Sequence, residues 1–407
     1  MIKVDLFFLN VLFTVNVLIW FLSLLLRLEK KFYLKPSTRL NPKLKVSVLV
    51  PLFKEKYESI MVTMKSIARQ TYPKKLLEVV LVVEPDDRST KDLIPRVLEF
   101  LGEHGISYRV VESDGRVKLK GHALNCALKT VEADVVAVYD ADDVFPEDQV
   151  EKAVALIEQG YDAVGTRVYR RRNTILGSFL LLDTFIWYNV FLPFFCAVAG
   201  AFPFSGEGLF VKRSAIEAVG GFPEVLTEDA YLSILMAEKG LKSALLDSEV
   251  EELAPKGWKS AVKQRLRWNR GYAQCLFRLL RAGISLKVKL GLLAAYWAPA
   301  VCASSLITST FFTLYWATWA FAPHITFVAP WMNAPIYTRG FYYWSAILAY
   351  LLTAVLIYTV AYVIAGGRFE RLAPYVITLP LYWMFLGLVA LLTPFAPSKK
   401  WLRTERR

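Results

Sequence analysis

Two carboxylates separated by one residue, Asp140 and Asp142, have the type and spacing that would hold a metal ion. They follow the apolar run Val135–Tyr139. Side chains two positions apart on an extended segment point the same way. Together they could bind one hard divalent cation, Mg²⁺ or Mn²⁺, and leave coordination positions for phosphate oxygens and water. Such an ion would offset charge on a diphosphate leaving group. A plain acidic loop is the alternative for this motif taken alone.

A second acidic motif, Thr227-Glu228-Asp229, is suited to removing a proton. Asp229 falls in the first turn of an expected helix, where its carboxylate could act as general base toward an attacking hydroxyl. Thr227 is also a good N-cap residue, and acids are favourable in a first helical turn. Helix capping is therefore the alternative for this motif.

Two further motifs have the chemistry to bind a nucleotide. Asp86 and Asp87 follow an apolar run, and a carboxylate there could accept a hydrogen bond from a nucleobase or a ribose hydroxyl. Lys118, Lys120 and Gly121 precede or open an expected helix, and lysines with a glycine at a helix N-terminus suit phosphate. The alternatives are an acidic turn and a basic loop, each exposed to solvent.

A basic helix carries a further candidate site. Gln264, Arg267 and Trp268 fall on one helical face, at positions i, i+3 and i+4. Arginine can hold a pyrophosphate through two hydrogen bonds, and tryptophan can stack on a sugar ring. The lysines and arginines around them suit an amphipathic helix on anionic lipid, so residues 251–285 are expected to lie at a membrane interface. A basic helix in solvent is the alternative.

The elements that must position these motifs alternate between strand-like and helix-like segments. Nearly continuous apolar runs, as expected of parallel strands buried on both faces, occupy Val46–Pro51, Glu78–Val83, Tyr108–Val111 and Val135–Tyr139. Helical periodicity occupies Glu58–Arg69, Lys91–Leu101 and Ala123–Val131. This alternation predicts a Rossmann-like α/β domain with a mostly parallel sheet. The acidic motifs follow strand ends, where ligands bind in such sheets.

Long uncharged segments flank this domain and predict transmembrane helices. Leu6–Leu26, within residues 1–31, is 21 residues long and is followed by Arg27, Lys30 and Lys31. By the positive-inside rule the catalytic domain then lies in the cytoplasm of an integral cell membrane protein. Residues 286–398 hold about three further spans, in the uncharged runs Leu290–Thr338, Gly340–Gly367 and Leu372–Ser398. The side of the basic tail, 399–407, depends on how often this region crosses.

One apolar segment lies inside the soluble domain. Residues 184–206 carry no charge and are rich in aromatic residues. A single crossing there would put the acidic motifs on opposite sides of the membrane, although they look like one site. We therefore expect the segment to lie at the membrane interface, with a buried hairpin as the alternative.

The overall composition narrows the possible classes of protein. The chain has 407 residues, a hydrophobic fraction of 55 % and a formal charge of +13. This much apolar sequence excludes a disordered chain and exceeds that of an ordinary soluble domain. The four cysteines form no C-x-x-C pair, which argues against disulfides and a structural zinc site. His122 is one of only three histidines, which argues against a histidine metal site and favours a polar helix-start role.

Taken in order, these motifs resemble the membrane-embedded family-2 glycosyltransferases. The resemblance is to the processive branch that holds cellulose, chitin, hyaluronan and poly-N-acetylglucosamine synthases, and it covers nearly the whole chain. The residues that carry it are Asp140-x-Asp142, Thr227-Glu228-Asp229 and Gln264-x-x-Arg267-Trp268. Phe204–Gly208 looks like the glycine-containing strand before the base motif of that branch. The resemblance implies a GT-A catalytic domain over residues 43–250, combined with transmembrane helices.

The resemblance also implies a role for each site residue. Asp229 would be the base of an inverting transfer, and Asp140 and Asp142 would bind Mg²⁺ or Mn²⁺ and the nucleotide. The remaining residues would contact the donor or the acceptor. Asp87, with Asp86, would contact the uracil, and Pro51 to Glu55 would form part of the nucleotide pocket. Gln264 and Arg267 would hold the diphosphate, and Trp268 would stack on the acceptor sugar.

The expected function is transfer of a sugar from a UDP donor to the hydroxyl of a growing glycan, with processive synthesis and passage into or across the membrane. The first alternative is transfer of a single sugar to a polyprenol phosphate or lipid, and the second is a non-catalytic membrane scaffold. A transporter is disfavoured because the spans carry no Asp, Glu, Lys or Arg. Nucleic acid is not an expected partner, since the basic residues flank apolar spans. Membrane lipids are expected partners, and the sequence names no protein partner.

Overall fold

The computed structural model describes residues 32–36, 43–171, 174–297, 352 and 355–395. The chain divides into two compact units, one of residues 29–297 with 396–407 and one of residues 1–28 with 298–395. The expected N-terminal helix within 1–31 and the basic tail 399–407 lie outside the described residues. Most of the expected spans in Leu290–Thr338 and Gly340–Gly367 also lies outside them.

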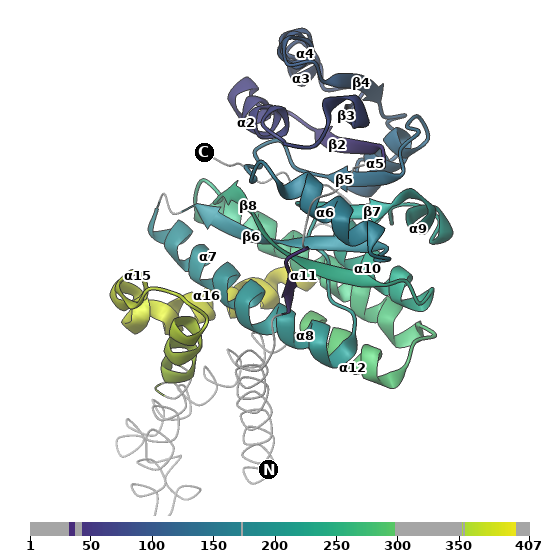
Figure 1. The fold of residues 1–407 in the computed structure, drawn as a ribbon. Helices are drawn as coiled ribbons and strands as arrows, with labels where there is room; N and C mark the ends of the chain where they lie inside the picture. The colour runs from purple at the N-terminus through teal and green to yellow at the C-terminus, as the bar shows by residue number, and fades with distance from the viewer. Residues whose placement is uncertain (1–31, 37–42, 172–173, 298–351, 353–354, 396–407) are drawn as a thin grey trace, which may run out of the picture. The chain divides into compact units, whose positions relative to one another are not determined.

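The larger unit is built on an eight-stranded mixed sheet (Figure 1). Its strands are β1 (Tyr33–Leu34), β2 (Val46–Leu52), β3 (Leu77–Val83), β4 (Ser107–Glu112), β5 (Val135–Val138), β6 (Ala163–Arg171), β7 (Leu209–Lys212) and β8 (Ser243–Leu253). Their order in space is β1-β8-β6-β7-β5-β2-β3-β4. β7 runs antiparallel to both its neighbours, and every other pair is parallel. The expected Rossmann-like, mostly parallel sheet is confirmed.

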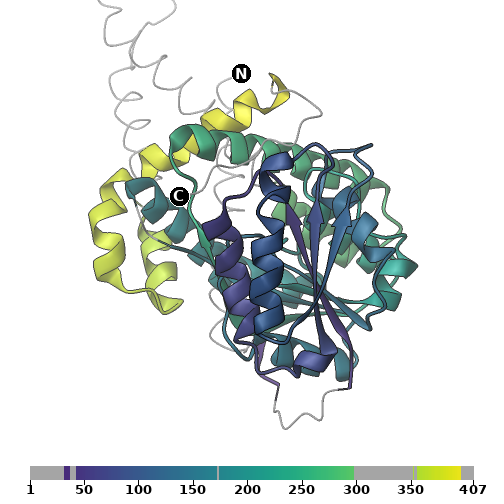
Figure 2. The same ribbon diagram turned by 90° about the horizontal axis from the view of Figure 1, so that it is seen from above.

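Successive residues of the central strands enter opposite cores, because side chains alternate across a strand. In β2, Val48 and Val50 join the core on one face and Leu49 joins the other. The first face is covered by α2 (Tyr57–Ala68), α4 (Ile94–Glu103) and α6 (Gln149–Glu158). The second is covered by α5 (Lys120–Leu128), α9 (Arg213–Ala218) and α10 (Glu228–Glu238). Figure 2 shows α2 and α4, in purple and blue, side by side along the sheet.

The helix expected over Lys91–Leu101 is two helices. A one-turn helix, α3 (Arg88–Lys91), follows β3, and α4 begins at Ile94. Pro95 stands in the first turn of α4, where its missing N–H and fixed φ are tolerated. A short 3₁₀ helix, η1 (Lys74–Leu76), leads into β3.

The apolar segment 184–206 is helical as far as Ala199. α7 (Ile175–Ile186), a π-helical turn η2 (Trp187–Phe191) and α8 (Leu192–Ala199) form one helix of 25 residues, Ile175–Ala199. It ends at Gly200, which takes the left-handed conformation with φ 71° that glycine accepts readily. The most apolar stretch of the helix is 67 % buried, and α7 packs on β6. The segment is therefore not the hairpin considered as the alternative.

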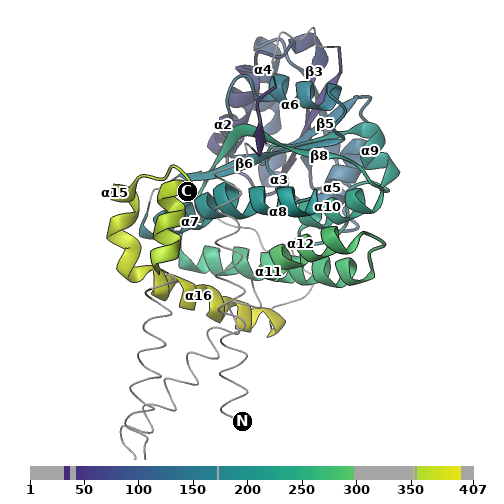
Figure 3. The same ribbon diagram turned by 60° about the horizontal axis from the view of Figure 1, so that its bottom comes forward.

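Two further helices pack beside this one. α11 (Trp258–Arg281) contacts α10, and α12 (Leu286–Tyr296) contacts both α8 and α11 (Figure 3). Ile234 of α10, Leu279 of α11 and Leu292 of α12 meet in a small core of their own. This packing fixes α11 against the start of α10, where the second acidic motif lies.

The described part of the smaller unit is helical. It comprises the apolar helix Val355–Ile364, α15 (Phe369–Leu372), η5 (Ala373–Thr378), α16 (Leu379–Leu392) and η6 (Thr393–Phe395). The continuous stretch Phe369–Phe395 is 27 residues long, and only 22 % of its most apolar window is buried. Together with Ile175–Ala199 it is one of two helices in the described ranges that are long and apolar enough to cross a membrane.

Candidate active site

The turn after β5 presents the first acidic motif. The buried Asp143 carboxylate accepts a hydrogen bond from the Asp140 backbone N–H at 2.7 Å. The Thr63 hydroxyl, from α2, lies 2.8 Å from the Asp140 carbonyl and accepts from the Asp143 N–H at 2.8 Å. These bonds fix the turn, so Asp143 has a structural role. The Asp140 side chain is 25 % exposed and lies beside the nearly buried Asp142.

Lys120, the first residue of α5, joins this turn to two other segments. Its ammonium group donates to the Asp140 carboxylate at 2.7 Å and to the Gly206 carbonyl at 3.0 Å. It also lies 3.8 Å from the Glu228 carboxylate. Burial lowers the pKa of Lys120, but the carboxylates of Asp140, Glu228 and Glu207 outweigh burial and raise this pKa overall. The structure thus places Lys120, expected to bind phosphate, as a permanent cation among acidic side chains.

Gly206 faces this cation at close range. A Cβ on Gly206 would lie 2.8 Å from the Lys120 nitrogen and 3.4 Å from the Asp229 carboxylate. A side chain at Gly206 would therefore displace the Lys120 ammonium group from its position. The motif Phe204–Gly208 was singled out in the sequence, but the contact of the Gly206 carbonyl with Lys120 was not expected, because the two residues are 86 positions apart.

The second acidic motif opens α10. Thr227 occupies the N-cap position, but within the described chain its side chain makes no capping hydrogen bond. Its hydroxyl instead lies 3.6 Å from the Cys275 sulfur of α11. The Asp229 carboxylate is half-buried and accepts from the Ala230 N–H at 2.8 Å. The structure thus contains part of the capping alternative: Glu228 and Asp229 stand in the first turn, but the Thr227 hydroxyl makes no capping bond among the described residues.

The environment of this acidic pair suits proton transfer. Burial raises the pKa of Glu228 and of Asp229, while Lys120 and Arg267 lower both and the neighbouring Asp229 raises that of Glu228. The pKa of each carboxyl remains above its ordinary value. A carboxylate with a raised pKa is a stronger base than an ordinary one and is common at catalytic sites.

α5 is tied to the loop before this motif. The Asn125 side chain donates to the Phe222 carbonyl at 2.8 Å and accepts from the Phe222 N–H at 2.7 Å. Gly121 lies so close to Pro223 that a Cβ would come within 2.1 Å of the Pro223 carbonyl oxygen. Gly121 and Asn125 therefore position Lys120 against Glu228.

The acidic pair after β3 divides into a structural and an exposed residue. Asp87 is buried and caps α3, accepting from the Thr90 N–H at 3.3 Å and the Ser89 hydroxyl at 2.7 Å. It also accepts a hydrogen bond from the Lys54 N–H. Asp86 is exposed and forms an ion pair with Lys118. Of the two, Asp86 presents its carboxylate to solvent.

The loop after β2 is held against the same helix. Pro51 lies buried within β2, and Glu55 follows in the loop, where its N–H donates to the Thr90 hydroxyl at 3.0 Å. Lys54 has a φ of 55°, which is uncommon for a residue other than glycine. The Asp87 carboxylate stabilises that conformation by accepting the Lys54 N–H.

The motif on α11 has polar atoms without partners in the described residues. Gln264 is 1 % exposed, and its Oε1 accepts no hydrogen bond there. The Nε of Arg267 likewise donates none within the described ranges. Buried polar atoms are nearly always hydrogen-bonded, so these two groups have the capacity to bind a ligand. The positive charge of Arg267 lowers the pKa of both Glu228 and Asp229.

Trp268 lies between two arginine side chains. The guanidinium carbons of Arg170 and Arg265 each lie 4.9 Å from the centre of its ring, the range of a cation–π contact. Arg170 is itself buried in an ion pair with Glu252. The ring is thus held between β6 and α11.

Two family models match the sequence. The model of glycosyl transferase family group 2 covers residues 135–395, and that of glycosyl transferase family 2 covers residues 47–216. A probable glycosyltransferase, YdaM of Bacillus subtilis, is 29 % identical over 60 % of this chain and 59 % of its own length. A cellulose synthase catalytic subunit (UDP-forming) of Xanthomonas axonopodis is 26 % identical over 56 % of this chain and 31 % of its own. The chain thus spans about a third to three fifths of the length of these two relatives.

A solved structure shares the fold. The mannosyltransferase PcManGT of Pyrobaculum calidifontis, in complex with GDP-Man and Mn²⁺, superposes with a TM-score of 0.64 and 24 % identity. The match covers 87 % of this chain and 97 % of that one. This similarity confirms the GT-A-type fold expected from the sequence.

Proposed function

The chain belongs to glycosyl transferase family group 2, and on that premise we propose that it transfers a sugar from a nucleotide-diphosphate donor to a hydroxyl group of an acceptor. One observation carries the proposal. The single cation Lys120 contacts Asp140 after β5, Gly206 before β7 and Glu228 at the start of α10. Motifs that are far apart in sequence are thereby gathered around one site.

Asp229 is proposed as the general base. Its half-buried carboxylate removes the proton of the acceptor hydroxyl, which then attacks the anomeric carbon of the donor sugar and displaces the nucleoside diphosphate. Attack opposite to the leaving group inverts the configuration at that carbon. The raised pKa of Asp229 supports this role, since it strengthens the carboxylate as a base.

Asp140 and Asp142 are proposed to hold Mg²⁺ or Mn²⁺. Carboxylate oxygens are the ligands these ions prefer, and Asp143 of the same turn uses one carboxylate oxygen to accept the Asp140 N–H. The bound ion would offset negative charge on the diphosphate. Lys120 and Arg267 add fixed positive charge to the same site, and Gln264 with Arg267 would contact the diphosphate.

UDP is the nucleotide we propose, with its base near the loops after β2 and β3. Asp86 has the exposed carboxylate there, whereas Asp87 shapes the pocket together with Pro51 and Glu55. Trp268, a half-buried residue beside two guanidinium groups, is proposed to stack on the acceptor sugar.

The product is proposed to be a glycan that grows by repeated addition of sugars and passes into or across the membrane. The protein is proposed to be an integral membrane protein with a cytoplasmic catalytic domain. The two long apolar helices support membrane attachment. The basic helix α11 and the partly buried helix Ile175–Ala199 support contact with membrane lipids at the interface.

A nucleotide-release assay on the full chain in nanodiscs tests this function. The assay would supply UDP- and GDP-linked sugars in turn, with Mg²⁺ or Mn²⁺ or with EDTA, and would size the product from any active donor. Asp229→Asn is the informative variant, because it keeps the side-chain volume and removes the base. Metal-dependent release that falls by at least about a hundredfold in Asp229→Asn, with a ladder of long products, is the expected result.

The other outcomes discriminate the alternatives. Addition of only one sugar in the presence of membrane lipids would replace the polymerising function by transfer to a lipid or polyprenol phosphate. Release with GDP-sugars alone would replace UDP as the donor. No release from any nucleotide sugar, by protein that is folded and supplied with lipid, would favour a non-catalytic membrane scaffold.

A further inference from the structure

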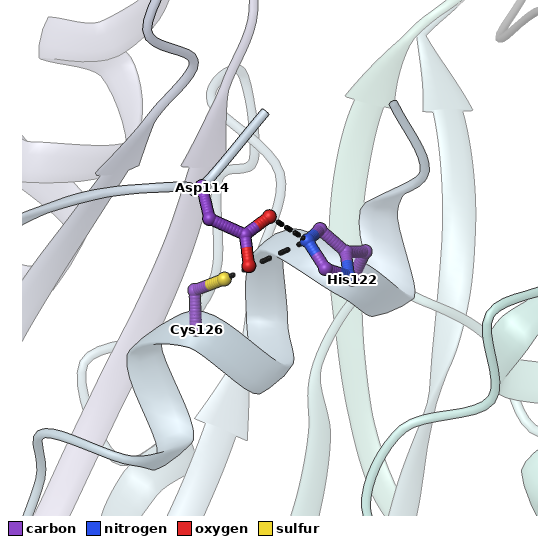
Figure 4. A group of neighbouring side chains, drawn as sticks. All are labelled: Asp114, His122 and Cys126. Atoms are coloured by element: carbon purple, nitrogen blue, oxygen red, sulfur yellow. Dashed lines mark hydrogen bonds and ion pairs between the residues drawn. The ribbon is translucent and has the colours of Figure 1, made fainter. Parts of the chain in front are cut away.

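Three side chains with metal-ligand chemistry meet beside α5. His122 and Cys126 are four residues apart and share one face of the helix, and Asp114 approaches them from the loop between β4 and α5 (Figure 4). The Asp114 carboxylate lies 2.6 Å from Nε2 of His122, and the Cys126 sulfur lies 3.9 Å from the same nitrogen. Lys120, two residues from His122, points from a different face of the helix into the catalytic site.

Neighbouring side chains orient two of these three groups. The Glu224 carboxylate lies 2.7 Å from Nδ1 of His122, so it can hold the proton on that nitrogen and leave the Nε2 lone pair toward Asp114 and Cys126. The guanidinium Nε of Arg116 donates to the second oxygen of Asp114 at 2.7 Å. The first oxygen accepts the Arg116 backbone N–H at 3.1 Å and faces His122. Carboxylates behind ligating histidines are a regular feature of zinc sites.

The spacing is close to that of a tetrahedral ion. Bond lengths of about 2.0–2.1 Å to nitrogen or oxygen and about 2.3 Å to sulfur place neighbouring ligand atoms about 3.3–3.6 Å apart. The pair Cys126–His122, at 3.9 Å, needs only a small contraction. The pair Asp114–His122, at 2.6 Å, must open, and the partly exposed Asp114 on its loop can move outward to allow this.

We propose that Asp114, His122 and Cys126 bind one Zn²⁺ ion, with water as the fourth ligand. Imidazole, thiolate and carboxylate are the ligands that zinc accepts together, whereas Mg²⁺ and Mn²⁺ prefer oxygen alone. The charges balance: the ion replaces one proton on His122 and one on Cys126 and leaves the net charge of the cluster unchanged. This cluster lies apart from Asp140 and Asp142, so the chain would hold two metals of different chemistry.

The proposed zinc site departs from the sequence-based expectation, which disfavoured a histidine or zinc centre. That expectation depended on the absence of C-x-x-C and the scarcity of histidine, and neither criterion detects one His, one Cys and one Asp brought together by folding. The proposed ion would fix the loop between β4 and α5. Because Lys118 of this loop pairs with Asp86 and α5 begins at Lys120, zinc would stabilise the nucleotide side of the catalytic site without touching the reacting atoms.

Cobalt substitution of the full chain in detergent micelles tests the proposal. Co²⁺ bound to a thiolate gives a charge-transfer band in the near ultraviolet, which an oxygen-only site such as Asp140/Asp142 cannot give. We expect about one thiolate-bound Co²⁺ per chain, displaced by Zn²⁺. Cys126→Ser should abolish the band, and the matched control Cys196→Ser, outside the cluster, should retain it.

A second variant keeps the test decisive if Cys126→Ser unfolds. Glu224→Gln leaves all three ligands in place and removes the carboxylate behind His122, so zinc affinity should fall by about 10- to 100-fold. Circular dichroism would verify that both variants are folded. Absence of the thiolate band in the wild type, or its persistence in folded Cys126→Ser, would overturn the proposal and leave His122 as an imidazolium bridging two carboxylates. Neither result depends on whether the protein transfers sugar.

Discussion

Replacing Lys120 by methionine tests the central electrostatic element of the site. Methionine has a similar length and no charge, so the variant removes a cation from between Asp140, Glu228 and the Gly206 carbonyl with little change in volume. Burial raises the pKa of Asp229 and Lys120 lowers it, so the loss of Lys120 should raise it further. A base with a higher pKa stays protonated up to a higher pH, so turnover should then require a more alkaline solution.

The distances set the size of the effect. Two unit charges 3.8 Å apart, as Lys120 and Glu228 are, attract by about 4 kcal/mol at an effective dielectric constant of 20 and by about 1 kcal/mol in water. Lys120 is only 8 % exposed, but the adjoining Asp140 side chain is 25 % exposed, so the site lies between these limits. At about 1.4 kcal/mol per pKa unit, the pKa of the acidic pair should rise by about one to three units.

The assay is the pH dependence of kcat/KM for nucleotide release. In the wild type, activity should fall as the pH drops through the raised pKa of the base. In Lys120→Met this acidic limb should move to higher pH by at least about one unit, with activity partly restored under alkaline conditions. Lys120→Arg keeps the charge and should keep the limb in place. Lys118→Met is the matched control, because Lys118 is exposed and a surface ion pair contributes about 0–1 kcal/mol.

One result would refute this reasoning. Lys120→Met could lose activity equally at every pH and keep its acidic limb at the wild-type position. Lys120 would then act by positioning Asp140 and the Gly206 carbonyl, and not by lowering the pKa of the base through its charge. A shift of equal size in Lys118→Met would assign the effect to the general field of the protein.

Three other perturbations have definite expected outcomes. Gly206→Ala should lower kcat at least about tenfold, because the new Cβ would lie 2.8 Å from the Lys120 nitrogen and displace it. The control Gly257→Ala should leave kcat unchanged, because its Cβ meets nothing within 4 Å. Equal effects of the two substitutions on kcat would contradict the packing argument. Gly271→Ala should reduce the free energy of unfolding by about 1–3 kcal/mol in denaturant titrations, since its Cβ would lie 2.4 Å from Thr227, and an unchanged midpoint would count against that contact. Removal of divalent metal by EDTA should stop sugar transfer and Mg²⁺ or Mn²⁺ should restore it, whereas full activity in EDTA would exclude a metal at Asp140 and Asp142.

The sheet could be predicted because each central strand is buried on both faces. Val46–Leu52 and Leu77–Val83 read as almost unbroken apolar runs for that reason. The antiparallel direction of β7 could not be predicted, since it depends on which strands the four residues Leu209–Lys212 join, far away in sequence. The break between α3 and α4 was also missed, although Pro95 was a visible signal.

The motifs of the site could be found from residue types and spacing, but the division of labour within them could not. Among adjacent acids, Asp87 and Asp143 serve the backbone, while Asp86 is exposed and Asp140 partly so. Identical side chains in consecutive positions have the same chemistry in a sequence. Only the direction in which each points, set by the turn that holds it, separates them.

The sequence by itself determined the class of fold, the two candidate acidic centres and the family that their order resembles, because these properties depend on periodicity and on spacing within short segments. Tertiary structure alone decided that Lys120 is a cation held among carboxylates, that the Gly206 carbonyl binds it, and that His122 and Cys126 meet Asp114. Each of these depends on atoms from separate elements coming within a few ångströms. Such distances are fixed by how the helices pack on the sheet, and no local pattern of residues encodes them.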